Sequence, residues 1–335
     1  MLLHPGIIGL IIGSGLTLLL LFSSALLGMQ ILRKWDITSS SELQLSLERK
    51  TYLVSTLVQY ALLFQVISAF LFIYTADDMH NLLVGAMCAT GSLNANPYGF
   101  PALYAQIVTL FLAAAWISLN RIDNRAEDYP LTRKKYSLLF LILPAVTAGY
   151  VLQLTYFGSI DPDVITSCCG VLFSEGGAGL GSSLSSLPVR KTEIVFGLLY
   201  LLVIVSGLLA ARSGRRPFTL LLSASSALFF FGAIASVITF ISLYFYQMPS
   251  HHCPFDILQS GYYYVGYPLY ATLFAGSFFG VMTGAVEPFR KIPSLAAVIP
   301  AVQRRWALTA TVAITLFVIL SIVPMVFTPF TLEGY

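Results

Sequence analysis

The chain alternates long apolar stretches with short polar ones along its whole length. Eight apolar stretches are long enough to cross a bilayer, because a helical span needs about 20 predominantly apolar residues. They cover residues 6 to 32, 52 to 75, 102 to 120, 136 to 158, 193 to 211, 217 to 246, 264 to 285 and 306 to 328. The pattern predicts an all-α polytopic membrane protein with eight transmembrane helices, forming a single membrane domain over residues 1 to 335.

Composition agrees with this class of protein. Apolar residues make up 57% of the chain and charged residues 10%, which departs from soluble averages toward a protein solvated by lipid. The opening "MLLHPG" lacks the basic start of a secretory signal, and the apolar run after it is too long for one. We therefore expect the first stretch to remain as a helix.

Lys and Arg fall almost entirely in alternate loops. Sixteen of the 18 basic residues follow spans one, three, five and seven: Arg33, Lys34, Arg49, Lys50, Arg121, Arg125, Arg133, Lys134, Lys135, Arg212, Arg215, Arg216, Arg290, Lys291, Arg304 and Arg305. Only Arg190 and Lys191 lie in the other loops. Because basic residues are enriched in cytoplasmic loops, we expect both termini outside, in a bacterial inner membrane. The net charge of +3 then reflects topology, and we expect no nucleic-acid partner.

The cysteines and histidines, which could bind a metal or undergo redox chemistry, lie in the loops expected on the outer side. Its loops are residues 77 to 101, 159 to 191 and 248 to 263. They contain all four cysteines and three of the four histidines: His80, Cys88, Cys168, Cys169, His251, His252 and Cys253. The remaining histidine, His4, precedes the first span. We expect these loops to form one Cys/His site facing the periplasm.

Three hypotheses remain open for this site. The first is binding or transfer of a soft metal, copper first, because thiolate and imidazole are the preferred ligands of Cu(I) and Zn(II). The candidate ligands are Cys88, Cys168, Cys169, His251, His252 and Cys253, with His80 next. No CxxC or HxxxH spacing supports the set, so the signal lies in composition alone. Such a protein would belong to a metal-delivery or maturation system, with partners in a membrane complex or a periplasmic metal or thiol carrier.

The second hypothesis is thiol–disulfide oxidoreduction coupled to a lipid quinone. The layout is similar to that of quinone-linked membrane enzymes that generate disulfides, which also hold cysteine pairs in outer loops at helix ends. Those enzymes use a CxxC pair, whereas this chain offers only the adjacent Cys168 and Cys169 or a pair formed by Cys88 and Cys253.

The third hypothesis is a structural subunit whose outer loops are cross-linked by disulfides, as an even cysteine count on an oxidising face allows. Whether the chain is an enzyme stays open.

Two short segments indicate an internal repeat. "GFPALYA" at residues 99 to 105 and "GYPLYA" at residues 266 to 271 resemble each other at the expected starts of spans three and seven. Spans one to four and five to eight would share one orientation, as a parallel four-plus-four repeat requires. In that arrangement Cys88 and Cys253 occupy matching loops, and we expect the two thiols to lie close together.

Overall fold

The computed structural model of the chain describes residues 3–37, 39, 41–161, 163, 165–166 and 180–332. Within these ranges the backbone forms helices and turns and contains no strand. Eight helices of the described chain are long and apolar enough to cross a membrane. They are α1 (Pro5–Lys34), α2 (Glu42–Asp78), α4 (Gly99–Asp123), α5 (Thr132–Gly158), α8 (Val189–Ser213), α9 (Arg216–Ser236), α11 (Gly266–Ala285) and α12 (Val298–Phe327). The expected all-α class and the eight spans are confirmed.

Several long helices extend beyond the apolar stretches that predicted them. α2 begins at Glu42, because the Ser41 side chain accepts a hydrogen bond from the backbone N–H of Gln44 and caps the helix there. By contrast, the expected stretch 217 to 246 ends where the structure ends it: α9 continues through a π-helix, η2 (Val237–Ile241), into α10 (Ser242–Tyr246). 3₁₀-helices follow two others: η1 (Met79–Leu82) after α2 and η5 (Glu287–Lys291) after α11.

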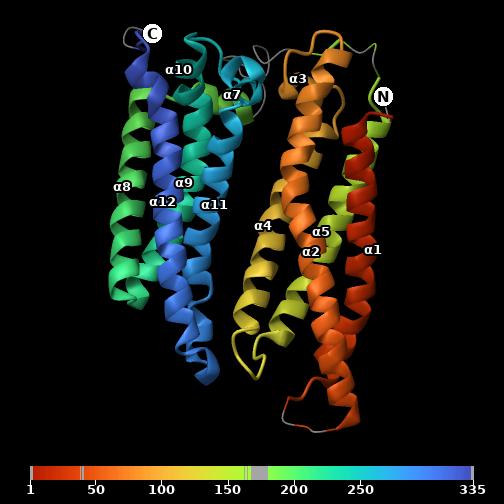
Figure 1. Cartoon of the computed structure of the whole chain (residues 1–335). Coiled ribbons are helices and arrows are strands. Elements are labelled where there is room, and N and C mark those ends of the chain that lie inside the picture. Colours follow the sequence, from red (N-terminus) through yellow and green to blue (C-terminus); the bar gives the residue numbers. More distant parts are fainter. Residues whose placement is uncertain are drawn as a thin grey trace. The chain divides into compact units, whose positions relative to one another are not determined.

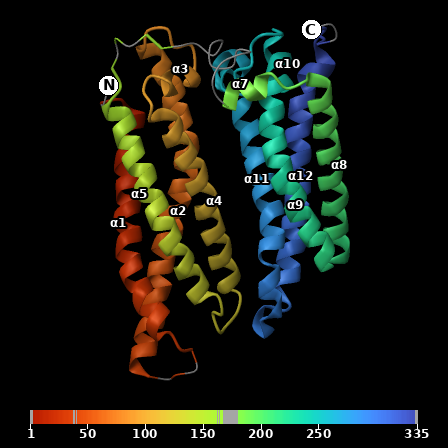
Figure 2. The same ribbon diagram turned by 180° about the vertical axis from the view of Figure 1, so that it is seen from behind.

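The chain forms two compact units. Unit 1 consists of Met1–Leu82 and Ser92–Val164, and unit 2 consists of Leu83–Gly91 and Ile165–Tyr335. In unit 1 the long helices contact one another in a closed ring in chain order, α1 to α2 to α4 to α5 and back to α1. In unit 2, α8, α9, α11 and α12 form the same kind of ring (Figures 1 and 2). Each unit is therefore a four-helix bundle, and whether both work as one membrane domain stays a prediction.

Unit 1 combines an apolar interior with two buried polar groups. Three glutamines from different helices hydrogen-bond in a row: Gln65 Nε2 donates to Gln106 Oε1 (3.0 Å), and Gln106 Nε2 donates to Gln153 Oε1 (2.9 Å). Lys135 Nζ lies 2.8 Å from Asp123 Oδ2, and both side chains are buried. These contacts tie α2, α4 and α5 together inside the bundle, where unpaired polar groups are costly.

Unit 2 brings its helices close together through small residues. On α11, Gly276, Gly280 and Gly284 are spaced four residues apart and are buried. A Cβ added at Gly280 would lie 2.0 Å from Ser226 Oγ on α9, and one at Gly276 would lie 3.0 Å from the backbone nitrogen of Ile314 on α12. Such spacing lets membrane helices approach closely enough to pack backbone against side chain.

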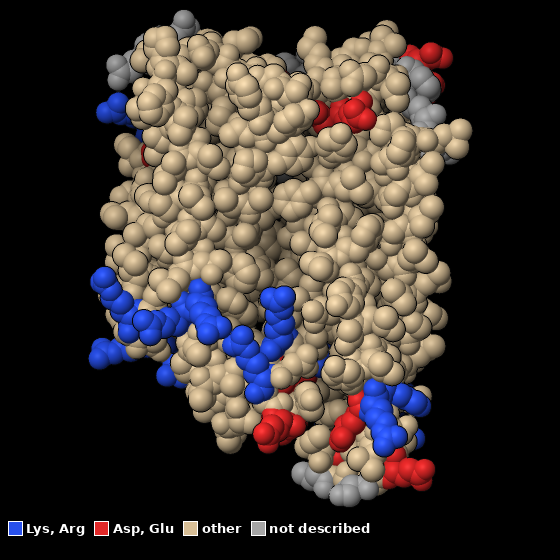
Figure 3. All heavy atoms as spheres, in the orientation of Figure 1, with Lys and Arg blue, Asp and Glu red and all other residues tan. Residues whose placement is uncertain are grey.

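The basic side chains follow the ends of the helices in each unit. In unit 2, seven of them lie where α8 passes into α9 and where α11 passes into α12: Arg212, Arg215, Arg216, Arg290, Lys291, Arg304 and Arg305. Taken unit by unit, most Lys and Arg of the visible face lie toward one helix end in Figure 3, with a smaller group near an opposite end. The short helices of the loops expected to face outward follow the opposite ends of the long helices in the described chain: α3 (Ala89–Leu93), α7 (Leu180–Ser185), η3 (Asp256–Leu258) and η4 (Ser260–Tyr262).

A nine-residue segment crosses from one unit to the other. Leu83–Gly91 belongs to unit 2, although the residues before and after it belong to unit 1. Gly85 has φ of +80°, and a Cβ there would lie 3.0 Å from the carbonyl oxygen of Thr166, so both conformation and space favour glycine. The Thr166 N–H donates to the carbonyl of Val84 over 3.0 Å. These contacts hold the segment that carries Cys88 within unit 2.

Candidate functional site

Cys88 and Cys253 meet inside unit 2. Their Sγ atoms lie 3.5 Å apart, and both side chains are fully buried. A disulfide bond would be about 2.05 Å long, so the structure holds the pair as two thiols in contact. The expectation that these two thiols lie close together is confirmed.

A carboxylate lies next to the two sulfurs. Cys253 Sγ donates to Asp256 Oδ1 over 3.2 Å, and donor atoms of Cys88, Cys253 and Asp256 all lie within 4.8 Å of one another. Cys253 Sγ also accepts the backbone N–H of Phe255 at 3.4 Å and lies 3.4 Å from the hydroxyl of Thr90. The sulfur of Cys253 is therefore surrounded by polar groups from two segments of unit 2.

His251 pairs with the carboxylate from the other side. Its Nε2 lies 2.5 Å from Asp256 Oδ2, with 27% of the His251 side chain and 14% of the Asp256 side chain exposed. The hydrogen bond to Asp256 raises the pKa of His251, and burial raises the pKa of Asp256. Both shifts favour retention of a proton in the pair. The groups thus run from buried thiols through a carboxylate to a partly exposed imidazole.

The loop of Cys253 is fixed by two tyrosines. Tyr246, the last residue of α10, donates its hydroxyl to the carbonyl of Cys253 over 2.6 Å and accepts the N–H of Ile257 at 3.1 Å. Tyr270, on α11, donates to the carbonyl of Pro254 over 2.6 Å. These hydroxyls satisfy backbone groups that a turn would otherwise leave unpaired.

The segment of Cys88 is also held by residues of unit 2. Gln259 Nε2 donates to the carbonyl of Met87 over 2.7 Å. Gly91 permits close packing of the segment, because a Cβ there would lie 2.9 Å from the Cα of Ala86. Backbone contacts therefore fix both cysteines independently of their sulfur atoms.

His252 makes a different contact from its neighbour. Its Nδ1 lies 2.8 Å from the carbonyl of Ile238, within the π-helix η2. A carbonyl only accepts, so Nδ1 carries the hydrogen of this contact. A π-helix displaces backbone carbonyls from the regular α-helical pattern, which makes them available to such side chains. Adjacent His251 and His252 thus have separate roles.

The remaining sequence candidates are His80, Cys168 and Cys169. His80 belongs to unit 1, where its Nδ1 hydrogen-bonds to the carbonyl of Asp77. Cys168 and Cys169 lie outside the described residues. Asp256 was missed by sequence reasoning, and the available signal was its place three residues after Cys253, in "CPFD".

The arrangement permits two kinds of chemistry. With a two-electron oxidant to take up both thiol hydrogens, the sulfurs would need to approach by about 1.5 Å to form a disulfide. Alternatively, deprotonated sulfurs could bind one metal ion, since two thiolates in a tetrahedral site with bonds of about 2.3 Å lie about 3.8 Å apart. Asp256 would serve as a proton acceptor in the first case and as a third ligand in the second.

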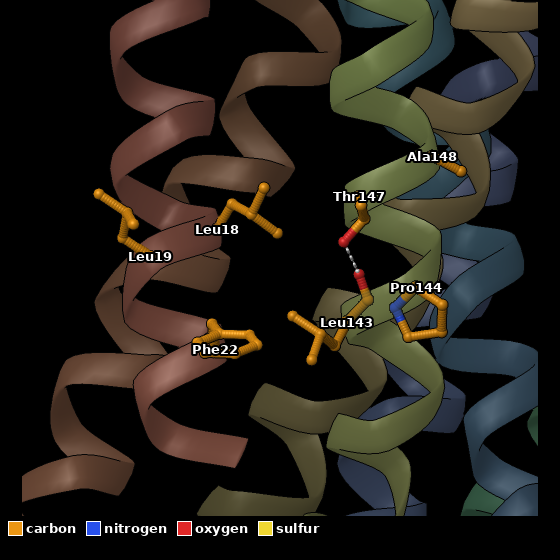
Figure 4. Close-up of a pocket in the computed structure, with 7 residues that line it drawn as sticks. All are labelled: Leu18, Leu19, Phe22, Leu143, Pro144, Thr147 and Ala148. Carbon is orange, nitrogen blue, oxygen red and sulfur yellow. Dashed lines mark hydrogen bonds between the residues drawn. The ribbon is translucent and has the colours of Figure 1, made fainter. Parts of the chain in front are cut away.

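An apolar groove in unit 1 is unrelated to this chemistry. It has a volume of about 690 Å³ and lies between α1 and α5 (Figure 4). Its lining residues are Leu18, Leu19, Phe22, Leu143, Pro144, Thr147 and Ala148. The one hydroxyl among them, on Thr147, donates to the carbonyl of Leu143, so the groove offers an apolar surface suited to hydrocarbon chains.

No protein-family model, curated protein or solved structure matches this chain.

Proposed function

We propose that Cys88 and Cys253 form a redox-active dithiol on the outer face of a bacterial inner membrane. The observation that carries the proposal is the contact of two fully buried sulfurs, 3.5 Å apart, from segments distant in sequence. The adjacent Asp256 and His251 support it, because oxidation of a dithiol releases protons that must reach an acceptor. The geometry favours this function over copper delivery, since a carboxylate oxygen is a poor ligand for a soft cation.

The reaction balances with a lipid quinone as the oxidant. The S–S bond forms as both S–H bonds break, and two electrons and two protons reduce the quinone to a quinol. A dithiol carried by a periplasmic protein then reduces the pair again by thiol–disulfide exchange. The net reaction is transfer of two electrons and two protons from a protein dithiol to quinone.

The proposed topology places this pair in an oxidising compartment. Both termini face the periplasm, on the argument that basic residues of alternate loops face the cytoplasm. The two bundles constitute a parallel four-plus-four repeat, supported by the matching helix rings and by the similar starts of α4 and α11. We expect a reporter that works only in the periplasm to be active when fused after Tyr335, and activity of a reporter that works only in the cytoplasm would reject the orientation.

A split chain tests the disulfide. A protease site is inserted at Leu187, in the exposed turn between α7 and α8. After cleavage, Cys253 is the single cysteine of the C-terminal fragment, because the other three precede the cut. We expect the fragments to stay joined on a non-reducing gel after oxidation with a short-chain quinone, with one quinol formed per bond, and to separate with dithiothreitol.

Matched variants identify the partner of Cys253. Cys88→Ser should separate the fragments under oxidising conditions, whereas the double variant Cys168→Ser/Cys169→Ser should leave them joined. Fragments that separate without reductant in the unsubstituted chain would refute the proposal. A Cys88–Cys253 disulfide that forms but never exchanges electrons with quinone would instead identify a purely structural disulfide.

A metal site is the second candidate, favoured by the three donor atoms within 4.8 Å of one another. With two sulfurs and one carboxylate oxygen, the group suits Zn²⁺ better than Cu⁺. Metal analysis of protein purified under reducing conditions tests it. We expect zinc near one equivalent if this candidate holds, and its loss in Cys88→Ser, Cys253→Ser and Asp256→Asn. Absence of bound zinc or copper in the reduced protein would eliminate it.

A further inference from the structure

The hydroxyls of Tyr246 and Tyr270 hydrogen-bond to the backbone of the cysteine loop. Tyr246 bonds the carbonyl of Cys253 and the N–H of Ile257, so one hydroxyl joins both ends of a five-residue loop. Tyr270 bonds the carbonyl of Pro254, the next peptide group. The two tyrosines come from α10 and α11, so the loop is attached to two helices of the bundle.

Fixing the loop affects the equilibrium between dithiol and disulfide. A pair of thiols oxidises more favourably when the chain already holds the sulfurs together, because less conformational freedom is lost on forming the bond. The segment of Cys88 is anchored separately, through Val84 and Met87. The tyrosine hydroxyls therefore limit the conformational freedom of the Cys253 loop in the dithiol state.

We infer that Tyr246 and Tyr270 are positioning residues that set the reduction equilibrium of the Cys88–Cys253 pair. The inference rests on the proposed redox function. The phenol rings have packing roles as well: the ring of Tyr246 lies 4.8 Å from that of His251 and 5.0 Å from that of Tyr262, centroid to centroid. Replacement by phenylalanine keeps the ring and removes only the hydroxyl, so it isolates the positioning effect.

The experiment measures the disulfide equilibrium in glutathione buffers. The full chain, in the Cys168→Ser/Cys169→Ser background, is equilibrated at defined ratios of reduced to oxidised glutathione and scored by alkylation of thiols. In Tyr246→Phe we expect the equilibrium to shift toward the dithiol by roughly three- to tenfold, as expected for loss of one or two hydrogen bonds. Tyr270→Phe should shift it in the same direction and serves as a second variant if Tyr246→Phe fails to fold.

Tyr200→Phe provides the matched control. The hydroxyl of Tyr200 donates to Thr315 Oγ1 over 3.4 Å, between α8 and α12 of the same unit, without contacting the cysteine loop. It should change thermal stability and leave the glutathione equilibrium unchanged. Tyrosine variants that lose stability without any shift of the equilibrium would overturn the inference while leaving the redox function intact. A parent chain that forms no Cys88–Cys253 disulfide in these buffers would overturn both.

Discussion

Gln106 donates from Nε2 to Oε1 of Gln153 over 2.9 Å, inside the bundle of unit 1. Gln106 is the central member of the row, because its Oε1 also accepts from Gln65. Gln153 Nε2 has no hydrogen-bond partner among the described residues. Replacing Gln106 would therefore break hydrogen bonds to two glutamines, whereas replacing Gln153 would break one.

We expect Gln106→Leu to destabilise the protein more than Gln153→Leu. The first substitution removes partners from both neighbouring glutamines, whereas the second removes an amide that is already incompletely bonded. The difference should be about 1 kcal/mol, since each buried polar group left unpaired costs about 1–3 kcal/mol. Unfolding in mixed micelles measures it, and equal effects would contradict the arrangement of the row.

The buried ion pair predicts a second effect on stability. Lys135→Met leaves the carboxylate of Asp123 without its cation, and we expect a loss of about 3–5 kcal/mol. Asp123 keeps bonds from the N–H of Leu131 and the hydroxyl of Thr132, so a neutral amide there should be tolerated better than an unpaired charge. The double variant Asp123→Asn/Lys135→Met should recover part of the loss in the same unfolding assay. A double variant less stable than Lys135→Met would argue against this account.

The close approach of α11 to α9 predicts a steric effect. Gly280→Ala places a methyl group against Ser226, whose short side chain cannot move away, and we expect a loss of about 1–3 kcal/mol. Gly197→Ala on α8 is the control, because a Cβ there meets no atom within 4 Å. It should be neutral or slightly stabilising. Restoring space with Ser226→Gly should reduce the effect of Gly280→Ala, as thermal unfolding in detergent can show.

Burial of the two sulfurs predicts slow reaction with bulky thiol reagents. In the Cys168→Ser/Cys169→Ser background, native Cys88 and Cys253 should react with a polymer-linked maleimide far more slowly than after unfolding. Adding Ser186→Cys, in the exposed turn before α8, gives an accessible reference thiol in the same molecule. Native labelling of Cys253 as fast as that of the reference would show that the site opens readily.

The long helices could be predicted because an apolar stretch in lipid must satisfy its own backbone, which only a helix or closed barrel can do. Their ends were less predictable, since caps such as Ser41 extend helices into water. The closeness of Cys88 and Cys253 was expected from the similar starts of α4 and α11, whereas the internal repeat behind that expectation stays a prediction. Whether a metal binds there stays a prediction.

Other parts of the site depend on contacts that are distant in sequence. Asp256 resembles an ordinary loop carboxylate until the fold brings Cys88 beside it. The role of the carbonyl of Ile238 depends on a π-helix, and its partner His252 lies 14 residues further on. By contrast, the four-residue spacing of Gly276, Gly280 and Gly284 is visible in the sequence and indicates close helix packing without any structure.

The crossing of Leu83–Gly91 into unit 2 has a consequence for the order of biosynthesis. The ribosome completes Cys88 when its partner Cys253 is still 165 residues from being made. Meanwhile the spans of unit 1 can already insert, and Cys168 and Cys169 appear before Cys253 does. If these loops face an oxidising compartment, as proposed, a nascent chain with an early thiol and two intervening thiols can form the wrong disulfide during translocation. Under that proposal, efficient maturation requires either a reduced Cys88 until synthesis ends or an isomerase that corrects its first pairing.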